Sequence, residues 1–248
     1  MQRHLWLDSL SRSWCPPWPC PICKTGRVVL RQGSVNSEET VESKREHNED
    51  YWGPEYLELI FSAWADCNNE HCKQSFVIAG KGGIENFIDD NTEESSWEER
   101  YNPTSVTPAP GIIDIPAACP RALRDLFFDA FRLYWTDAES CAGKIRVSVE
   151  ALLTHLGVPT SDGTDNNNPR RLSLHRRIEL LEKTNPEPAR LLMAIKWMGN
   201  AGSHGGGVFR RDTLDALEIL EHILPELLER RSQKMQQLAE RLVRRHKQ

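Results

Sequence analysis

The amino-acid sequence predicts an α+β fold, in which a small N-terminal β domain precedes a C-terminal all-α helical bundle. Two observations support this prediction. Short runs of β-forming residues, separated by Gly and Asn clusters, occupy residues 1–100, whereas helical periodicity begins after Pro120 and continues through residues 120–248. Repeated prolines between them interrupt helices and sheet ladders. We therefore expect residues 101–119 to form a semi-rigid linker.

Composition excludes several classes of protein. The 248 residues carry 31 Lys+Arg and 36 Asp+Glu, a net charge of -5, and the mean hydropathy is -0.56. No apolar run approaches the roughly 18 residues that a membrane span needs, and the first residues do not form a secretory signal. We expect a soluble, cytoplasmic protein without membrane association. A disordered chain and an exported disulfide scaffold are excluded.

Charge divides unevenly along the chain. Residues 1–119 hold 10 basic and 19 acidic side chains, a net of -9, and residues 120–248 hold 21 basic and 17 acidic side chains, a net of +4. A general basic surface for nucleic acid is therefore absent. Basic clusters in the second half could still follow a phosphate backbone, but glutamates interrupt them, as on many solvated helix faces.

The first domain is expected to contain three short strands, at Arg27–Leu30, Tyr56–Phe61 and Gln74–Ile78. The segment Glu38–Asp50 is polar and mostly acidic, which predicts a solvated loop.

The second domain is expected to begin with a helix over Arg121–Trp135. A second helix is predicted from Asp137, which can cap it, to Gly157. Its apolar residues follow the spacing of one buried face: Ile145, Val149, Leu152, Leu153 and Leu156.

Further helical patterns cover Arg171–Lys183, Pro188–Met198 and the chain from Thr213 onward, after a polar loop at Ser161–Asn168. The charged tail, Glu226–Lys247, carries a sparse apolar stripe. It is expected to project or to pair with another helix, and we expect the helical domain to form a homodimer.

Four of the seven cysteines form two close pairs, each followed by a β-like run. This is the order of a zinc ribbon, in which two tight turns hold one ion between four thiolates. Four thiolates leave no open position for water, so a structural role is favoured over a catalytic one. The predicted ligands of a structural Zn²⁺ ion are Cys20, Cys23, Cys67 and Cys72.

The second pair has a looser spacing than the commonest one, so His71 or Cys15 could replace a thiolate. An odd number of cysteines disfavours a disulfide framework. Cys119 and Cys141 lie in the helical half and are expected to be buried thiols without a nucleophilic role.

The most unusual segment follows an apolar helix in which Leu192 and Ile195 are expected to point inward. Asn200 and His204 are four residues apart, so they share a face if this helix continues, and three glycines then permit a sharp exit. Helix termination alone also explains the pattern.

Pro120 to about Arg231, a little under half of the chain, resembles domain-of-unknown-function family 4145, a HEPN-like helical domain. Three segments carry the resemblance: Arg146-Val147-Ser148-Val149-Glu150-Ala151-Leu152-Leu153, Leu156-Gly157-Val158 and Gly199-Asn200-Ala201-Gly202-Ser203-His204. The resemblance implies a HEPN-like bundle behind an N-terminal cysteine-rich segment. By analogy with relatives in restriction and anti-phage proteins, it also implies a defence role.

Many HEPN domains are metal-independent ribonucleases whose signature is Arg, a polar residue and His at a dimer interface. The resemblance places Asn200 and His204 at the last two positions, where His would exchange a proton and Arg would neutralise the phosphate. Gly199 stands at the arginine position, and glycine cannot stabilise a phosphorane. Positive charge would have to come from elsewhere in the sequence: Lys196, Arg146 or Arg190.

Arg146 and Glu150 lie four residues apart on the second predicted helix. Such a pair is often a surface ion pair of little energetic value. A partly buried pair could instead orient His204, and the resemblance places it against the Asn200/His204 segment.

The leading hypothesis is a non-catalytic recognition or assembly module that binds a protein partner or nucleic acid such as RNA, in bacterial anti-phage or restriction-type defence. Two alternatives remain open. One is a metal-independent endoribonuclease with the catalytic residues His204, Asn200, Lys196, Arg146 and Glu150. The other is a nucleotide-sensing regulator that uses the same pocket.

Overall fold

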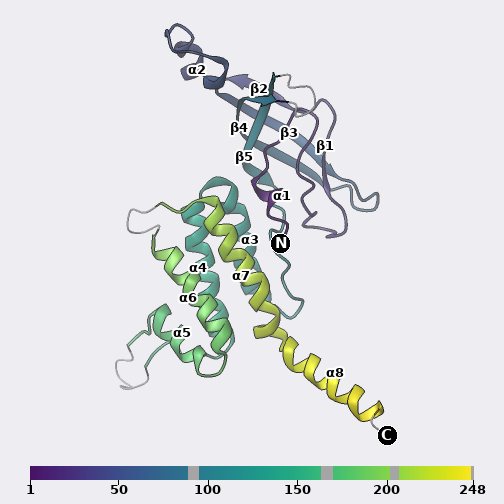
Figure 1. The fold of residues 1–248 in the computed structure, drawn as a ribbon, viewed down its shortest axis with the longest axis vertical. Coiled ribbons are helices and arrows are strands. Elements are labelled where there is room, and N and C mark those ends of the chain that lie inside the picture. Colours follow the sequence, from purple (N-terminus) through teal and green to yellow (C-terminus); the bar gives the residue numbers. More distant parts are fainter. Residues whose placement is uncertain (89–94, 163–169, 202–206, 247–248) are drawn as a thin grey trace. The chain divides into compact units, whose positions relative to one another are not determined.

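The computed structural model describes residues 1–88, 95–162, 170–201 and 207–246. Two units make up the chain: a sheet unit, Gln2–Gly111, and a helical unit, Ile112–Gln248 together with Met1. The first is an antiparallel β-sheet and the second is built from helices (Figure 1). The α+β prediction is therefore confirmed.

Where it is described, the sheet unit has five antiparallel strands: β1 (Val28–Leu30), β2 (Asn36–Glu39), β3 (Leu59–Cys67), β4 (Ser75–Ile88) and β5 (Ser95–Thr107). Strands β1 and β2 pair with the same edge of β3, one near each of its ends, and β4 and β5 follow on its other side. Outside the sheet lie the short helices α1 (His4–Leu7) and α2 (Val41–Glu46) and the 3₁₀ turn η1 (Pro54–Tyr56).

Side chains alternate along β3 between the core and solvent, as in a half-buried antiparallel strand. Buried and exposed residues exchange places from Leu59 to Trp64, and the strand ends on the buried Cys67. Trp18 and Tyr101, both fully buried, contribute the largest side chains to this core. The buried face of β3 and these two aromatic side chains therefore belong to one core.

The N-terminal segment pairs with the free edge of β5 at one point. Leu10 and Tyr101 exchange backbone hydrogen bonds of 2.8 and 2.9 Å. Two residues later, Arg12 pairs with Glu99 of β5 and donates to Ser37 of β2 at 3.1 Å. An uncovered strand edge is a template for unwanted pairing, so this segment also protects the sheet.

The predicted loop at Glu38–Asp50 is wrong, because its first part contains β2 and α2. Thr40 caps α2 by accepting a hydrogen bond from the Ser43 amide at 3.1 Å. The buried Ser43 hydroxyl donates to Glu39 at 2.7 Å and accepts from the Glu58 amide at 3.1 Å. The acidic residues of this segment therefore lie largely on the solvent-facing sides of β2 and α2 rather than in a loop.

The predicted linker at 101–119 is also wrong over its first part, because residues 101–107 belong to β5. The register shifts at this point: Ala79 pairs with Ser105 and Gly80 with Pro103, which leaves Thr104 as an extra residue. A bulge tolerates proline because the regular hydrogen-bond pattern is interrupted there, so the backbone N–H that proline lacks is not needed. Gly80 permits the close approach, since a Cβ there would lie 2.2 Å from the Asn102 carbonyl oxygen.

The described part of the helical unit contains six helices: α3 (Arg121–Thr136), α4 (Ala138–His155), α5 (Leu174–Glu182), α6 (Pro186–Ala201), α7 (Arg210–Glu229) and α8 (Arg231–His246). These bounds confirm the helices predicted at 121–135 and 137–157, and α4 contacts α3, α5, α6 and α7. The face predicted for α4 is buried at Ile145, Val149, Leu152 and Leu153, and so are Leu192 and Ile195 of α6. Gly157, with φ of 77°, ends α4 in the left-handed conformation that glycine accepts readily.

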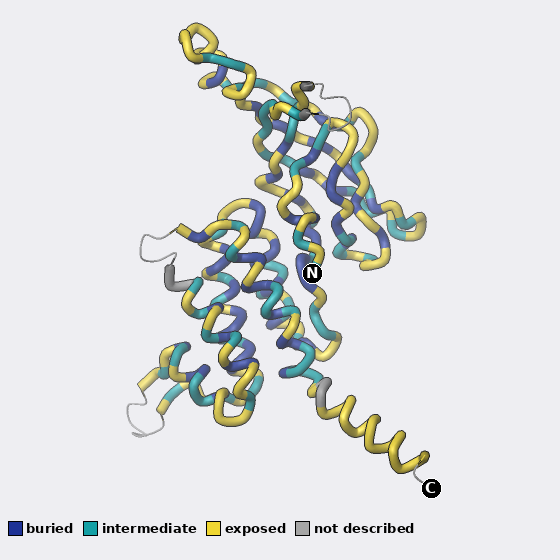
Figure 2. Tube along the Cα trace, in the orientation of Figure 1, coloured by how far each residue is buried: buried dark blue, intermediate teal, exposed yellow. Residues whose placement is uncertain are grey.

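Helix α8 extends beyond α7 (Figure 1), and its described side chains are exposed along its length (Figure 2). Within the described residues, no helix combines the length and apolarity needed to cross a membrane.

We predict that Asp137→Ala lowers the free energy of unfolding of the helical unit by about 1 kcal/mol. The Asp137 carboxylate accepts from the amides of Glu139 and Ser140 at 3.3 and 2.9 Å and so caps α4. Asp137→Asn keeps an acceptor and is the matched control. The measurement is denaturant unfolding monitored by circular dichroism.

The same substitution has a predicted pH dependence. Hydrogen bonds from Ser140, the side chain first, hold the pKa of Asp137 below its ordinary value. The cap is therefore fully formed above the unfolded-state pKa, about 3.9, and is lost as the pH falls through the lower folded-state pKa. The stability difference between wild type and Asp137→Ala should vanish in that acidic range. A difference that grows on acidification would contradict this role.

Candidate functional site

The four predicted cysteine ligands form one cluster, which we call the four-cysteine cluster. All four Sγ atoms lie within 4.8 Å of one another, and they belong to Cys20, Cys23, Cys67 and Cys72. The Sγ atoms of Cys20 and Cys72 are 3.8 Å apart, and those of Cys23 and Cys67 are 3.6 Å apart. Each of these short distances therefore joins a cysteine of the first sequence pair to a cysteine of the second pair.

The sheet brings these two pairs together. Cys20 and Cys23 lie in the turn before β1, whereas Cys67 ends β3 and Cys72 lies in the turn that leads to β4. In the antiparallel register of β1 and β3, Val28 faces Cys67. The first turn is therefore held directly against the second.

The sulfur spacing fits a tetrahedral metal ion. Metal–sulfur bonds of about 2.3 Å to a tetrahedral ion place the sulfurs about 3.8 Å apart, close to the distances between the paired Sγ atoms. Disulfide sulfurs are only about 2.05 Å apart, and all seven cysteines are free thiols. The cluster is thus arranged to bind a metal ion rather than to form disulfides.

The two turns share two backbone features. The residue after the second cysteine of each pair is left-handed, with φ of 60° at Lys24 and 50° at Lys73. Backbone amides point at sulfur in both turns: Gly26 N–H donates to Cys23 Sγ at 3.2 Å, and Asn69 N–H donates to Cys67 Sγ at 3.5 Å. Such N–H···S contacts stabilise thiolates, the form that binds a metal.

Gly26 is the packing constraint of the cluster. A Cβ at this position would lie 2.2 Å from Cys67 Sγ and 2.9 Å from the Cβ of Asn69. No larger residue fits without moving a ligand sulfur. Nothing in the cysteine spacing itself predicts this glycine.

The thiols of the cluster differ in acidity. The hydrogen bond from the Gly26 amide lowers the pKa of Cys23 to about 6. Burial raises the pKa of Cys67 to about 12. Metal binding must therefore displace the Cys67 proton, so metal affinity should fall as the pH decreases.

Neither of the two alternative ligands belongs to the cluster. The buried Cys15 thiol contacts the Val28 carbonyl at 3.8 Å, and its burial raises the pKa of Cys15 to about 11. His71 is exposed and also lies outside the group of four. Cys119 and Cys141 are buried in the helical unit, as expected.

The second predicted site is described in part. His204 lies outside the described residues, and for Asn200 only the backbone, in the last turn of α6, is described. The Lys196 ammonium lies 3.5 Å from the centre of the adjacent Trp197 ring. The proposed association of Asn200 with His204 stays a prediction.

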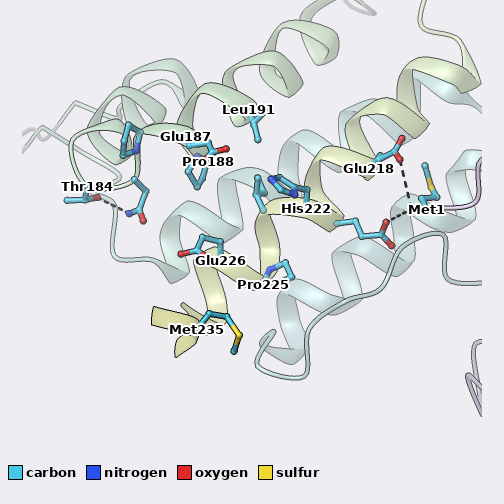
Figure 3. A pocket seen from close by; sticks show the side chains of 14 residues that line it. Met1, Thr184, Glu187, Pro188, Leu191, Glu218, His222, Pro225, Glu226 and Met235 are labelled. Atoms are coloured by element: carbon cyan, nitrogen blue, oxygen red, sulfur yellow. Dashed lines mark hydrogen bonds and ion pairs between the residues drawn. The ribbon is translucent and has the colours of Figure 1, made fainter. Parts of the chain in front are cut away.

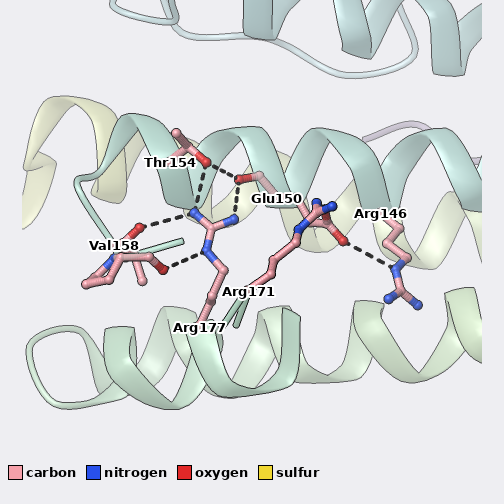
Figure 4. A network of polar contacts seen from close by, with 7 residues as sticks. Arg146, Glu150, Thr154, Val158, Arg171 and Arg177 are labelled. Atoms are coloured by element: carbon pink, nitrogen blue, oxygen red, sulfur yellow. Dashed lines mark hydrogen bonds and ion pairs between the residues drawn. The ribbon is translucent and has the colours of Figure 1, made fainter. Parts of the chain in front are cut away.

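Arg146 and Glu150 form the expected ion pair on α4, at 3.6 Å, with both side chains partly exposed. Two partners that the sequence did not reveal join them (Figure 4): Arg171, 3.4 Å from Glu150, and Arg177, whose guanidinium donates to the Glu150 carbonyl at 3.1 Å. These partners are 21 and 27 residues from Glu150, so no local pattern could have indicated them.

An acidic groove lies between the start of α6 and α7, with a volume of about 1270 Å³ (Figure 3). We define it by its four carboxylates and the apolar residues between them. The carboxylates are those of Glu187, Glu218, Glu221 and Glu226, and the apolar residues include Pro188, Leu191, Ile223 and Pro225. Met235 of α8 lies at its margin.

Two family models match the chain. Domain of unknown function (DUF8608) matches residues 8–106, and Domain of unknown function (DUF4145) matches residues 128–244. The second match confirms the family resemblance of the helical unit. The first match, residues 8–106, contains the whole four-cysteine cluster and nearly all of β5. It agrees with a sheet unit that extends past residue 100. No curated protein and no solved structure matches the chain.

We predict that Gly26→Ala weakens metal binding by about ten- to a hundredfold, because the added Cβ displaces the Cys67 sulfur. The measurement is competition with a chelating dye, after elemental analysis has established the metal content of the wild type. Cys15→Ser, which changes a nearby thiol outside the cluster, is the control and should bind normally. Unchanged affinity in Gly26→Ala, or lost binding in Cys15→Ser, would refute the assignment.

Proposed function

We propose that this chain is a non-catalytic recognition and assembly protein, in which a zinc-ribbon module accompanies a HEPN-like bundle. The observation that carries the proposal is α8, an exposed amphipathic helix in the same unit as a groove of complementary charge. We place its action in bacterial anti-phage or restriction-type defence, by analogy with the wider family of the helical unit.

Zinc is the metal that best suits the four-cysteine cluster. Four thiolates in a tetrahedral arrangement favour Zn²⁺ over the hard cations Mg²⁺ and Ca²⁺, which prefer oxygen ligands. With four protein ligands no coordination position remains for water or substrate. The ion would then stabilise the sheet unit without taking part in chemistry, and about one zinc per chain is expected.

The apolar stripe of α8 supports the assembly role. Met235, Leu238 and Leu242 recur at the spacing of one helix face, and their exposed fractions are 53%, 41% and 57%. Basic side chains surround this stripe. Within Arg231–His246, five Lys and Arg residues stand against one Glu, a net charge of +4.

The acidic groove is complementary to this helix in charge and in apolar character. It contributes four carboxylates around proline, leucine and isoleucine side chains, and two of them, those of Glu218 and Glu221, also pair with the Met1 ammonium at 3.9 and 2.9 Å. Helix α8 contributes leucines between arginines and a lysine. Within one chain, Met235 is the one described residue of α8 that lines the groove. We propose that α8 of one copy occupies the groove of a second copy, which gives a reciprocal homodimer.

The absence of an arginine at Gly199 supports a non-catalytic role for the Asn200/His204 segment. In the ribonuclease pattern that the family resemblance suggests, this arginine neutralises the phosphate in the transition state. Without it, we propose that the segment contributes to partner recognition, and a protein partner suits the net charge of -5 better than nucleic acid does.

We predict that Leu238→Glu and Leu242→Glu each weaken the dimer by at least about a hundredfold. Each change removes a leucine that the proposed dimer would bury, worth about 1.5–3 kcal/mol, and a symmetric dimer loses it twice. Sedimentation equilibrium measures the association. Gln237→Glu, on the opposite face of α8, is the matched control. A monomeric wild type at 100 μM, roughly the concentration at which weak dimers form, would defeat the assembly proposal.

We predict that His204→Ala alters partner binding or self-association without changing any chemical rate. The assay incubates wild type and variant with RNA in metal-free buffer that lacks chelator, so that the four-cysteine cluster is undisturbed. Wild type is expected to leave the RNA intact. Cleavage by the wild type that is lost in His204→Ala would establish the ribonuclease alternative instead.

A further inference from the structure

A second cavity of the helical unit, which we call the arginine pocket, has the opposite charge to the acidic groove. It lies beside α4 and the start of α5 and has a volume of about 590 Å³. This is within the range of about 300–1,000 Å³ that small-molecule sites occupy. The polar residues that matter for its chemistry are Arg146, Glu150, Thr160, Arg171, Ser173 and Arg177.

The lining of the arginine pocket carries a net positive charge. Among the described residues that line it, three are arginines and one, Glu150, is acidic, which is a net charge of +2. Arg146 and Arg171 both approach this carboxylate, but at 3.6 and 3.4 Å, longer than an optimal charge-assisted hydrogen bond. The Glu150 carboxylate therefore holds two cations near each other at the pocket.

Arg177 gives the pocket a rigid, positively charged wall. The residue is 5% exposed, and its guanidinium donates to four neutral oxygens: the carbonyls of Pro159, Glu150 and Val158 and the hydroxyl of Thr154. Burial lowers the pKa of Arg177, although arginine remains protonated. Its charge is thus buried among dipoles rather than paired directly with a carboxylate (Figure 4).

The backbone also favours an anion at this position. Ser161 and Arg171 form an antiparallel bridge, and the Leu172 amide donates to the Thr160 carbonyl at 2.9 Å, so the backbone of Arg171 is anchored although its side chain is 85% exposed. Ser173 caps α5, and the first turn of this helix lines the pocket. The positive end of the helix dipole adds to the field of the arginines.

We propose that the arginine pocket binds a small phosphate-bearing molecule of nucleotide size, with Arg146 and Arg171 contacting the phosphates. Val147, Ala151 and Leu172 supply an apolar wall for the remainder of the ligand. A nucleic-acid strand fits less well, because it requires an extended basic face. On α5 the next arginine, Arg176, is already paired with Glu179 at 2.8 Å. This site is separate from the dimer proposed above and does not depend on it.

Isothermal titration calorimetry of the full chain tests the site with three probes: ATP, inorganic pyrophosphate and adenosine. We expect saturable binding of ATP and pyrophosphate and no binding of adenosine. Arg171→Gln and Arg146→Gln should each weaken ATP binding by about tenfold or more, because each removes a hydrogen bond to a charged group. Arg171→Lys, which keeps the charge but loses the bidentate fork, should restore part of the affinity.

Arg176→Gln is the matched control, since it removes a neighbouring arginine that does not line the pocket. It should bind ATP like the wild type. The exposed Arg171 side chain can be replaced without loss of the fold, which circular dichroism melting verifies. The proposal fails if neither ATP nor pyrophosphate binds at about 1 mM, a weak limit for specific ligands. It also fails if adenosine binds as well as ATP, or if Arg171→Gln and Arg146→Gln both retain wild-type affinity.

Discussion

The pairing of β1 with β3 is the constraint on which the sheet unit depends. It sets Val28 opposite Cys67 and so brings two cysteine pairs, separated by more than forty residues, into one cluster. The dependence is mutual. A strand of three residues contributes little stability alone, and an ion bound by both turns would tie β1 to β3 from one end. The free energy of metal binding would then be part of the free energy of folding.

The cysteine cluster was predictable from the sequence, because its ligands occur in two local pairs and the chemistry of thiolates is specific. Much of the surrounding sheet was not. Strand β5 escaped prediction because Pro103 argues against a strand, and its tolerance depends on Gly80 of the neighbouring strand. Strand β2 escaped because its acidic residues match a solvated loop. In both cases the strand forms because it pairs with another strand, β4 for β5 and β3 for β2, that local sequence patterns do not indicate.

In the helical unit, too, features set by neighbouring residues were predictable, and contacts between residues distant in the sequence were not. Apolar periodicity identified α3 and α4 and the buried face of α4, since one face of a helix is determined by residues a few positions apart. The ion pair of Arg146 with Glu150 was predictable for the same reason. Its association with Arg171 and Arg177 was not, because these residues lie 21 and 27 positions from Glu150 and an isolated bridge between Ser161 and Arg171 brings them back to α4. The expected contact of the pair with His204 stays a prediction.

The order of the cysteines along the chain has a consequence for biosynthesis. A ribosome releases the N-terminus first, so the turn of Cys20 and Cys23 emerges well before Cys67 and Cys72. An ion captured by the early turn alone would keep two positions for water or for foreign thiols. Release of residue 72 is therefore the earliest moment at which the site can close, and the nascent chain is exposed to incorrect coordination until then.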